Sequence, residues 1–178
     1  EKDIEFAKGS GVQAIWAPNL EDIFPNGPES SFTLKAPKYL QDHLCGKERK
    51  GHFDGVATII SRFLSLIKPK ILILGEKDWQ QLIIIKNLIE DLNLPVEVRG
   101  VATVREKNGL ALSSRNSYLS KKEINQALSL PKILTDSQSQ HFSGKNLNLK
   151  EIRSKLEAEG LKVEYVEMVD PFLLQPSY

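Results

Sequence analysis

Cysteine, histidine and methionine are scarce in this chain of 178 residues, which contains one Cys, three His and one Met. The single Cys45 cannot form an internal disulfide, and three scattered histidines do not provide a zinc ligand set. We therefore expect a protein of the reducing cytoplasm that has neither structural disulfides nor a zinc site.

Long apolar runs and a charge excess of one sign are also lacking. No apolar run approaches the roughly 20 residues of a transmembrane helix, and the opening EKDIEFAKGS has no signal-peptide pattern. The formal net charge is only +1, whereas dedicated nucleic-acid binders usually show a marked basic excess. These absences argue against a membrane protein and against a nucleic-acid partner.

What the chain does have is a globular composition, with 40% hydrophobic and 26% charged residues. This balance excludes wholesale disorder. The length suffices for one good core, or for one domain with a small appendage. Because the sequence starts without Met and stops at LLQPSY, we expect it to be a piece of a longer protein.

The middle of the chain predicts a strand, a helix and a second strand. KILILG at 70–75 is a short buried strand, DWQQLIIIKNLIEDLN at 78–93 is a helix apolar on most sides, and PVEVRGVAT at 95–103 is the next strand. A helix over 55–68 precedes them and ends at Pro69. This order is typical of a βαβ unit with parallel strands, so the predicted fold class is α/β.

The N-terminal third reads as the tail of an αβ unit. DIEFAKGSG at 3–11 predicts a helix end closed by glycine, VQAIWAP at 12–18 predicts a short strand, and the Pro- and Gly-containing 19–31 predicts a loop. We assign residues 1–105 to the C-terminal part of a Rossmann-like domain.

The remaining residues, 106–178, predict a polar loop and a small α+β domain. The stretch 104–120 has no periodicity, and long loops of this kind are more often functional than idle. Ser120 and Glu123 form an S-x-x-E capping box for a following helix, a second capped helix runs over 148–159, and the alternation at 161–171 predicts a strand.

Polar residues follow both predicted strands of the βαβ unit, where open α/β sheets bind ligands. Lys77 opposes the dipole at a helix start, so an anionic ligand would supply a reason for it. Asp78 is explained equally well as the N-cap of the helix, and Gly75 as a turn or as a point of close ligand approach. Two neutral glutamines follow, and nothing local decides whether Gln81 meets a substrate.

Two other stretches carry cations or hydroxyls. SSRN offers Ser113, Ser114 and the Arg115 guanidinium, the groups that a phosphate needs, although a solvated turn with a cap is an equal reading. The basic loop KERKGHFDG contains Arg49 and His52, and charge runs of this kind are usually solvated faces.

Several stretches together resemble the pantoate–beta-alanine ligase (pantothenate synthetase) family. They are GKERKGHFDGV, LGEKDWQQL and VATVREKNGLALSSRNSYLS, with weaker likeness in GVQAIWAPNLEDIFPNG and EYVEMVDP. They follow the family order and spacing across nearly the whole chain. GEKDWQQL and GLALSSRNSYLS at this separation are the most specific pair.

The resemblance implies a ligase of the nucleotidylyl-transferase superfamily on a Rossmann-like parallel sheet. In this family pantoate attacks the α-phosphorus of Mg²⁺-bound ATP to give pantoyl adenylate and pyrophosphate. Beta-alanine then displaces AMP and forms pantothenate, a precursor of coenzyme A. The family also implies a homodimer.

The resemblance assigns roles to residues only where the motifs match. The implied ATP-binding residues are Gly75, Lys77, Asp78, Val104, Ser113, Ser114 and Arg115. Of these, Lys77 and the SSR stretch, the counterpart of the KMSKS loop of synthetases, would hold the phosphates and be catalytic. Asp78 and Gly75 would meet the ribose, and the Val104 backbone the adenine.

Three further roles follow from the same resemblance. Gln81 would bind pantoate. Arg49 and His52 match a mobile loop that closes near the site. Asp3 matches an acidic position near the family's magnesium.

Two departures from the family pattern stand out. Lys50 replaces the proline of RPGHF, which makes the mobile loop more basic. The His-x-Gly-His motif and the opening strand and helix of the family are absent, so we expect an N-terminally truncated fragment that is inactive alone.

Some family members continue into a cytidylate kinase domain, which the chain does not exclude. Two alternatives stay open, a related nucleotidyltransferase with another acid substrate and a non-catalytic nucleotide-binding module.

Overall fold

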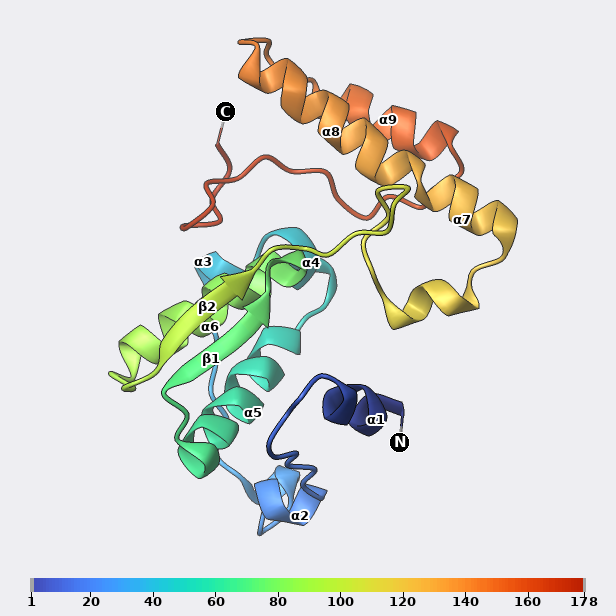
Figure 1. Ribbon diagram of the computed structural model, residues 1–178. Coiled ribbons are helices and arrows are strands. Elements are labelled where there is room, and N and C mark those ends of the chain that lie inside the picture. Colours follow the sequence, from blue (N-terminus) through green and yellow to red (C-terminus); the bar gives the residue numbers. More distant parts are fainter. Residues whose placement is uncertain (1, 178) are drawn as a thin grey trace. The chain divides into compact units, whose positions relative to one another are not determined.

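The computed structural model describes residues 2–177 and divides the chain into two units, residues 1–33 and 34–178 (Figure 1). Among the described helices, none has the length and hydrophobicity that crossing a lipid bilayer requires.

The first unit is built from short helical pieces. Helix α1, Lys2–Gly9, confirms the predicted helix end, and Gly11 follows it with φ of +79°. The predicted loop contains helix α2, Leu20–Ile23, and the 3₁₀ turn η1, Pro28–Ser30. The Asp22 carboxylate accepts the Asn19 N–H at 2.8 Å, a local bond that makes the first of these turns helical.

The strand predicted at 12–18 was wrong. These residues form no ladder, because no strand among residues 2–177 pairs with them. An alternating segment needs a neighbour for its backbone hydrogen bonds before it becomes a strand.

The predicted βαβ unit is confirmed in the second unit. Strand β1, Ile71–Gly75, leads through the 3₁₀ turn η2, Glu76–Asp78, into helix α6, Trp79–Asp91. Strand β2, Glu97–Val101, then pairs with β1 in parallel, with Ile71 opposite Glu97 (Figure 1). The carboxyl end of β1 and the amino end of α6 therefore meet at residues 75–79, the position where α/β sheets bind ligands.

Helix α6 is buried on two sides, as its apolar composition predicts. Ile83 and Ile84 pack in one cluster, which also contains Ala36, Leu40, Phe53 and Leu174. Ile85 and Ile89 pack in a second cluster with Leu64 and with side chains of both strands. Burial of this extent stabilises the helix and fixes the direction in which its N-terminus points.

Helix α5, His52–Ile67, begins three residues before the predicted start at 55. Gly51 precedes it with φ of +77°, a conformation that glycine adopts without strain. Two short helices before it were not predicted, α3, Lys38–Gln41, and α4, Leu44–Glu48. Each has only four or five residues, too few for a hydrophobic period to be recognised.

The C-terminal part of the second unit is helical. The loop after β2 folds back through an isolated bridge between Arg105 and Ala111 and reaches the 3₁₀ turn η3, Ser114–Tyr118. Helices α7, Lys121–Ala127, α8, Ser129–Phe142, and α9, Leu149–Ala158, follow. Figure 1 shows α8 and α9 side by side, in agreement with their contacts.

The predicted caps of these helices are confirmed. Ser120 N–H donates to the Glu123 carboxylate at 2.8 Å, and Glu123 N–H donates to the Ser120 hydroxyl at 3.3 Å, which is a full capping box. The Asn148 side chain accepts the N–H of Glu151 at 3.2 Å. Gly160 stops α9 with φ of +84°.

The strand predicted at 161–171 was also wrong. This segment makes only an isolated bridge between Val169 and Pro176. The Asp170 carboxylate accepts two backbone N–H groups, from Phe172 and Leu173, and this local turn places Leu174 in the α6 cluster with no exposed surface. The domain boundary expected between 105 and 106 stays a prediction.

Candidate functional site

A cavity of about 580 Å³ lies in the second unit beyond the end of β1. Its volume falls within the roughly 300–1,000 Å³ of ligand sites. We call residues 44–53 and 77–81 its helix wall, and residues 113–115 with Tyr165 its loop wall. Eight of the residues predicted from the sequence line it: Arg49, His52, Lys77, Asp78, Gln81, Ser113, Ser114 and Arg115.

Lys77 and Asp78 lie in η2, directly before α6. Asp78 occupies the N-cap position of α6, yet its carboxylate makes no capping hydrogen bond. The cap interpretation therefore accounts for its position but leaves its carboxylate free for a ligand. Lys77 is exposed, and it has no ion pair within residues 2–177. A cation that lacks a protein partner beside a helix N-terminus suits an anionic ligand.

Two neighbouring glutamines of α6 have different roles, which the sequence did not distinguish. Gln80 is buried at 5% exposure, and its amide donates to the carbonyl oxygens of Leu40 at 2.9 Å and of His43 at 2.8 Å. Its oxygen accepts the N–H of Gly46 at 3.2 Å. Gln81 lines the cavity, and its side chain makes no hydrogen bond within residues 2–177. Gln80 thus holds the wall together, and Gln81 is available to a ligand.

The segment from residue 44 to 53 contributes Cys45, Arg49 and His52 to the helix wall. Burial raises the pKa of the Cys45 thiol, with Asp78 and Glu164 adding to the rise and Arg49 opposing it, so the thiol stays protonated at neutral pH. It donates to the Gln80 side-chain oxygen at 3.2 Å. This cysteine therefore serves the wall as a hydrogen-bond donor rather than as a nucleophile.

His52 is neutral at physiological pH. Burial lowers the pKa of its imidazole, the Arg49 guanidinium lowers it further, and Asp78 partly opposes them. An Arg49 nitrogen lies 3.2 Å from His52 Nδ1, and since arginine can only donate, Nδ1 accepts and the proton resides on Nε2. The pair thus offers two donor groups, the charged Arg49 guanidinium and the neutral Nε2–H of His52.

The SSRN stretch forms the loop wall at the start of η3. The Ser113 hydroxyl accepts the N–H of Arg115 at 3.2 Å, so Ser113 caps the turn η3. Its hydroxyl proton makes no hydrogen bond within residues 2–177 and is available to a ligand. The guanidinium of Arg115 is exposed and has no ion pair within the described chain. Asn116 donates to the carbonyl oxygen of Ala111 at 3.0 Å and fixes the turn locally.

Three predicted site residues do not line this cavity. Gly75 has φ of −75°, which any residue adopts, and a Cβ there would meet nothing within 4 Å. The described structure thus gives no steric or backbone reason for a glycine here, and both readings of Gly75, turn and close ligand approach, stay predictions. Val104 lies after β2, and its carbonyl oxygen accepts the N–H of Leu112 at 2.9 Å. Asp3 belongs to the first unit, outside the one that holds the cavity.

Sequence reasoning missed three aromatic residues of the cavity, Phe53, Trp79 and Tyr165. Trp79 donates its indole N–H to the carbonyl oxygen of Pro171 at 2.8 Å, and thereby ties the start of α6 to the C-terminal segment. Burial raises the pKa of Tyr165, and neighbouring acidic groups including Glu167 add to the rise. Tyr165 lies on an irregular segment, where no periodicity could have marked it.

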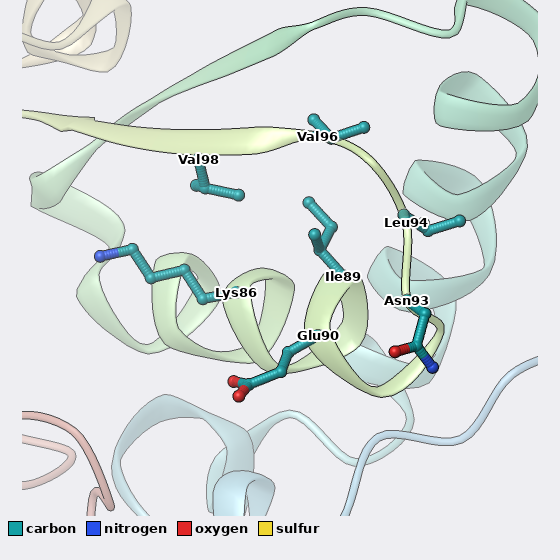
Figure 2. A pocket seen from close by; sticks show the side chains of 7 residues that line it. All are labelled: Lys86, Ile89, Glu90, Asn93, Leu94, Val96 and Val98. Atoms are coloured by element: carbon teal, nitrogen blue, oxygen red, sulfur yellow. The ribbon is translucent and has the colours of Figure 1, made fainter.

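A second cavity, of about 500 Å³, lies between α6 and β2. Figure 2 shows Ile89 and Val98 pointing into it and the charged ends of Lys86 and Glu90 at its edge. No predicted site residue lines it. Its apolar floor has no convergent cations, so its chemistry does not suit a phosphate.

The described residues contain no group of three or more His, Cys, Asp or Glu side chains that could hold a metal ion. Asp78 is the one carboxylate that lines the main cavity within residues 2–177. Mg²⁺ often binds through one or two carboxylates and the phosphates of a substrate. Asp78 is thus the residue of this cavity whose carboxylate could contribute to holding such an ion.

A family model for pantoate–beta-alanine ligase matches residues 1–178, the whole chain. The chain belongs to the pantoate–beta-alanine ligase family. It is 50% identical over 178 residues to a bifunctional pantoate ligase/cytidylate kinase of Prochlorococcus marinus. This alignment covers 100% of the present chain and 35% of the Prochlorococcus protein. It is 49% identical to a protein of the same name from a Synechococcus species, in an alignment that covers 99% of the present chain and 36% of the Synechococcus protein. The chain thus spans about a third of these ligase relatives.

Solved structures of the ligase family support the fold. Pantothenate synthetase from Thermus thermophilus matches with a TM-score of 0.87 and 34% identity over 99% of this chain and 64% of that one. The ligase from Francisella tularensis, complexed with beta-gamma ATP and beta-alanine, matches with a TM-score of 0.82 and 31% identity over 95% and 61%. The α/β, Rossmann-like prediction is therefore confirmed.

Proposed function

We propose that this chain is the part of a longer pantoate–beta-alanine ligase that contributes one side of the adenylation site. The longer enzyme joins pantoate to beta-alanine at the expense of ATP through pantoyl adenylate, and releases pyrophosphate and AMP. The proposal rests on one observation above all. In a member of this family, Lys77, Gln81 and Arg115 line one cavity although they come from separate elements.

In the first step a pantoate carboxylate oxygen attacks the α-phosphorus of ATP and pyrophosphate leaves. Negative charge accumulates on the phosphate oxygens, and Lys77 and Arg115 stabilise it as fixed cations. The hydroxyls of Ser113 and Ser114 donate hydrogen bonds to the same oxygens. These residues are catalytic because they contact the reacting phosphates.

The remaining residues of the cavity bind and orient the substrates. Asp78 accepts hydrogen bonds from the ribose hydroxyls, and the ribose passes close to Gly75. The adenine meets the Val104 backbone. Gln81 uses its free amide to bind pantoate. The neighbouring Gln80 is not available for this role, because its amide and its oxygen are already hydrogen-bonded to the backbone.

Two residues of the helix wall act from the edge of the cavity. Arg49 and neutral His52 close toward the bound phosphates and donate from a segment that excludes water. Beta-alanine then attacks the acyl carbon of the adenylate with its neutral amine, and AMP leaves. A magnesium ion would supply positive charge to the ATP phosphates, and Asp3 is kept as a proposed ligand to it.

The setting of the enzyme is part of the proposal. The relatives' names include cytidylate kinase, so we propose that activity for the longer protein too. A homodimer and a cytoplasmic location are proposed from the family. The chain alone lacks the His-x-Gly-His motif and is expected to be inactive.

The test is AMP release by the longer enzyme from ATP, pantoate and beta-alanine, followed with a coupled assay. Omission of either acid should abolish release. Release that persists with another carboxylic acid in place of pantoate would favour the related nucleotidyltransferase. Saturable ATP binding without any release would favour a non-catalytic module.

A further inference from the structure

A separate polar cavity of about 610 Å³ lies beside the helix wall. Three lysines line it, Lys38, Lys47 and Lys50, together with the carboxylates of Asp42 and Asp54. It shares no lining residue with the main cavity. Lys50 is the residue that replaces the family's proline, and the proposed function gives it no role.

The three ammonium groups are available to a ligand. None of them forms an ion pair within residues 2–177. The Asp54 carboxylate is already engaged, because it accepts the N–H of Ala36 at 2.8 Å and the side-chain amide of Gln41 at 3.2 Å. Asp42 is exposed to solvent. The three lysines therefore outnumber the two carboxylates, and Oδ1 of Asp54 already accepts two hydrogen bonds from neutral donors.

One short segment separates this cavity from the main one. Arg49 and His52 line the main cavity, whereas Lys47 and Lys50 of the same segment line the lysine cavity. Gly46 lines the lysine cavity, its N–H donates to Gln80 of the main cavity, and an added Cβ would collide with the Gln41 carbonyl oxygen. A ligand that binds Lys47 and Lys50 would thus also affect the position of Arg49 and His52, which belong to the same segment.

We propose that the lysine cavity binds a phosphate-bearing small anion and that its occupation positions Arg49 and His52. A phosphate or pyrophosphate group suits a cavity lined by three lysines, because each ammonium can offer charge-assisted hydrogen bonds to a different oxygen. Free phosphate and the phosphates of a nucleotide share this chemistry. The binding itself does not depend on the proposed ligase function.

The experiment is a titration of the ¹⁵N-labelled chain with inorganic phosphate, pyrophosphate and ATP in separate arms, at constant ionic strength. We expect pyrophosphate to shift the amides of residues 46–51 in a saturable manner. The double variant Lys47→Ala/Lys50→Ala should weaken this binding about tenfold or more, since charge-assisted hydrogen bonds are lost. Lys86→Ala, an exposed lysine at the α6–β2 cavity, is the matched control and should leave it unchanged.

The position of the anion and its effect are read separately. Lys77→Ala should not weaken pyrophosphate binding at 46–51, and if it alone abolished binding, the anion would lie in the main cavity and the proposal would be wrong. Equal losses of pyrophosphate affinity in the double variant and in Lys86→Ala would mean non-specific electrostatic attraction and would also overturn the proposal. The absence of saturable pyrophosphate binding would overturn it as well. The His52 ring resonances should move with the 46–51 amides, and ring resonances that stay fixed at saturation would overturn the positioning role.

Discussion

The two walls of the main cavity are held by hydrogen bonds of different range. In the helix wall, Gln80 reaches the carbonyl oxygens of Leu40 and His43, which are 40 and 37 residues away in the chain. In the loop wall, Ser113 bonds Arg115, two residues away, and Asn116 bonds Ala111, five residues away. The helix wall is therefore part of the buried fold, whereas the loop wall depends on local turns.

This difference indicates how the site works. A wall held by buried, long-range bonds is preorganised and opens only with much of the fold. A wall held by local bonds opens at low cost and gains order from a ligand. We therefore expect the helix wall to set the position of the substrate and the loop wall to close on its phosphates.

The largest effect is expected on the rate of adenylate formation when the charged Lys77 of the helix wall is replaced. Lys77→Ala in the longer enzyme should lower the rate of adenylate formation by about 10² to 10³, the usual cost of one transition-state donor. The measurement is pyrophosphate release in single turnover. Lys86→Ala is the control for loss of one exposed lysine, and near-normal release by Lys77→Ala would remove the role assigned to it.

The next effect concerns the bonds that make the helix wall rigid. Gln80→Ala leaves the carbonyl oxygens of Leu40 and His43 without their buried donor, so the free energy of unfolding should fall by about 3 kcal/mol. Urea denaturation of the chain measures it. Gln81→Ala, one residue on and partly exposed, should cost less than about 0.5 kcal/mol. Equal costs for the two variants would contradict the division of roles.

A smaller and selective effect is expected on substrate binding. Gln81→Ala in the longer enzyme should weaken pantoate binding about tenfold, the value of one well-placed hydrogen bond. Titration calorimetry with pantoate and with ATP separates the two affinities. An equal loss for ATP would show that Gln81 does not discriminate between the substrates.

The smallest effect is the titration of His52. Its pKa should lie below the ordinary 6.5, because burial and Arg49 disfavour the charged ring. Since the folded-state value is the lower one, this residue stabilises the fold fully above pH 6.5, and the contribution is lost as the pH falls toward the folded-state pKa. NMR titration of the chain measures the value, and Arg49→Gln should raise it partway. A pKa at or above 6.5 would contradict the assigned surroundings.

How far the sequence predicted the structure depended on the range of the interactions. The βαβ unit and the caps at Ser120 and Asn148 follow from neighbouring residues and were predicted. The segments 12–18 and 161–171 alternate in the same way, yet form no strand, because within residues 2–177 no strand pairs with them and Val169 makes only an isolated bridge to Pro176.

The candidate site shows the same limit. Lys77, Asp78 and the SSRN stretch were found because each follows a predicted strand, and parallel strands end at one edge of a sheet. Gln80 could not be told from Gln81, because its partners lie about 40 residues earlier in short helices that have no periodic signal. Tyr165 reaches the cavity from an irregular segment.

The most direct test asks whether the two walls form one nucleotide site. Hydrogen–deuterium exchange of the longer enzyme, followed by mass spectrometry, should show peptides over 76–82 and 110–118 becoming protected at the same ATP concentration, with the larger change at 110–118. Peptides over 86–98, which line the cavity of Figure 2, should not change. Protection of only one wall, or protection centred on 86–98, would contradict the account.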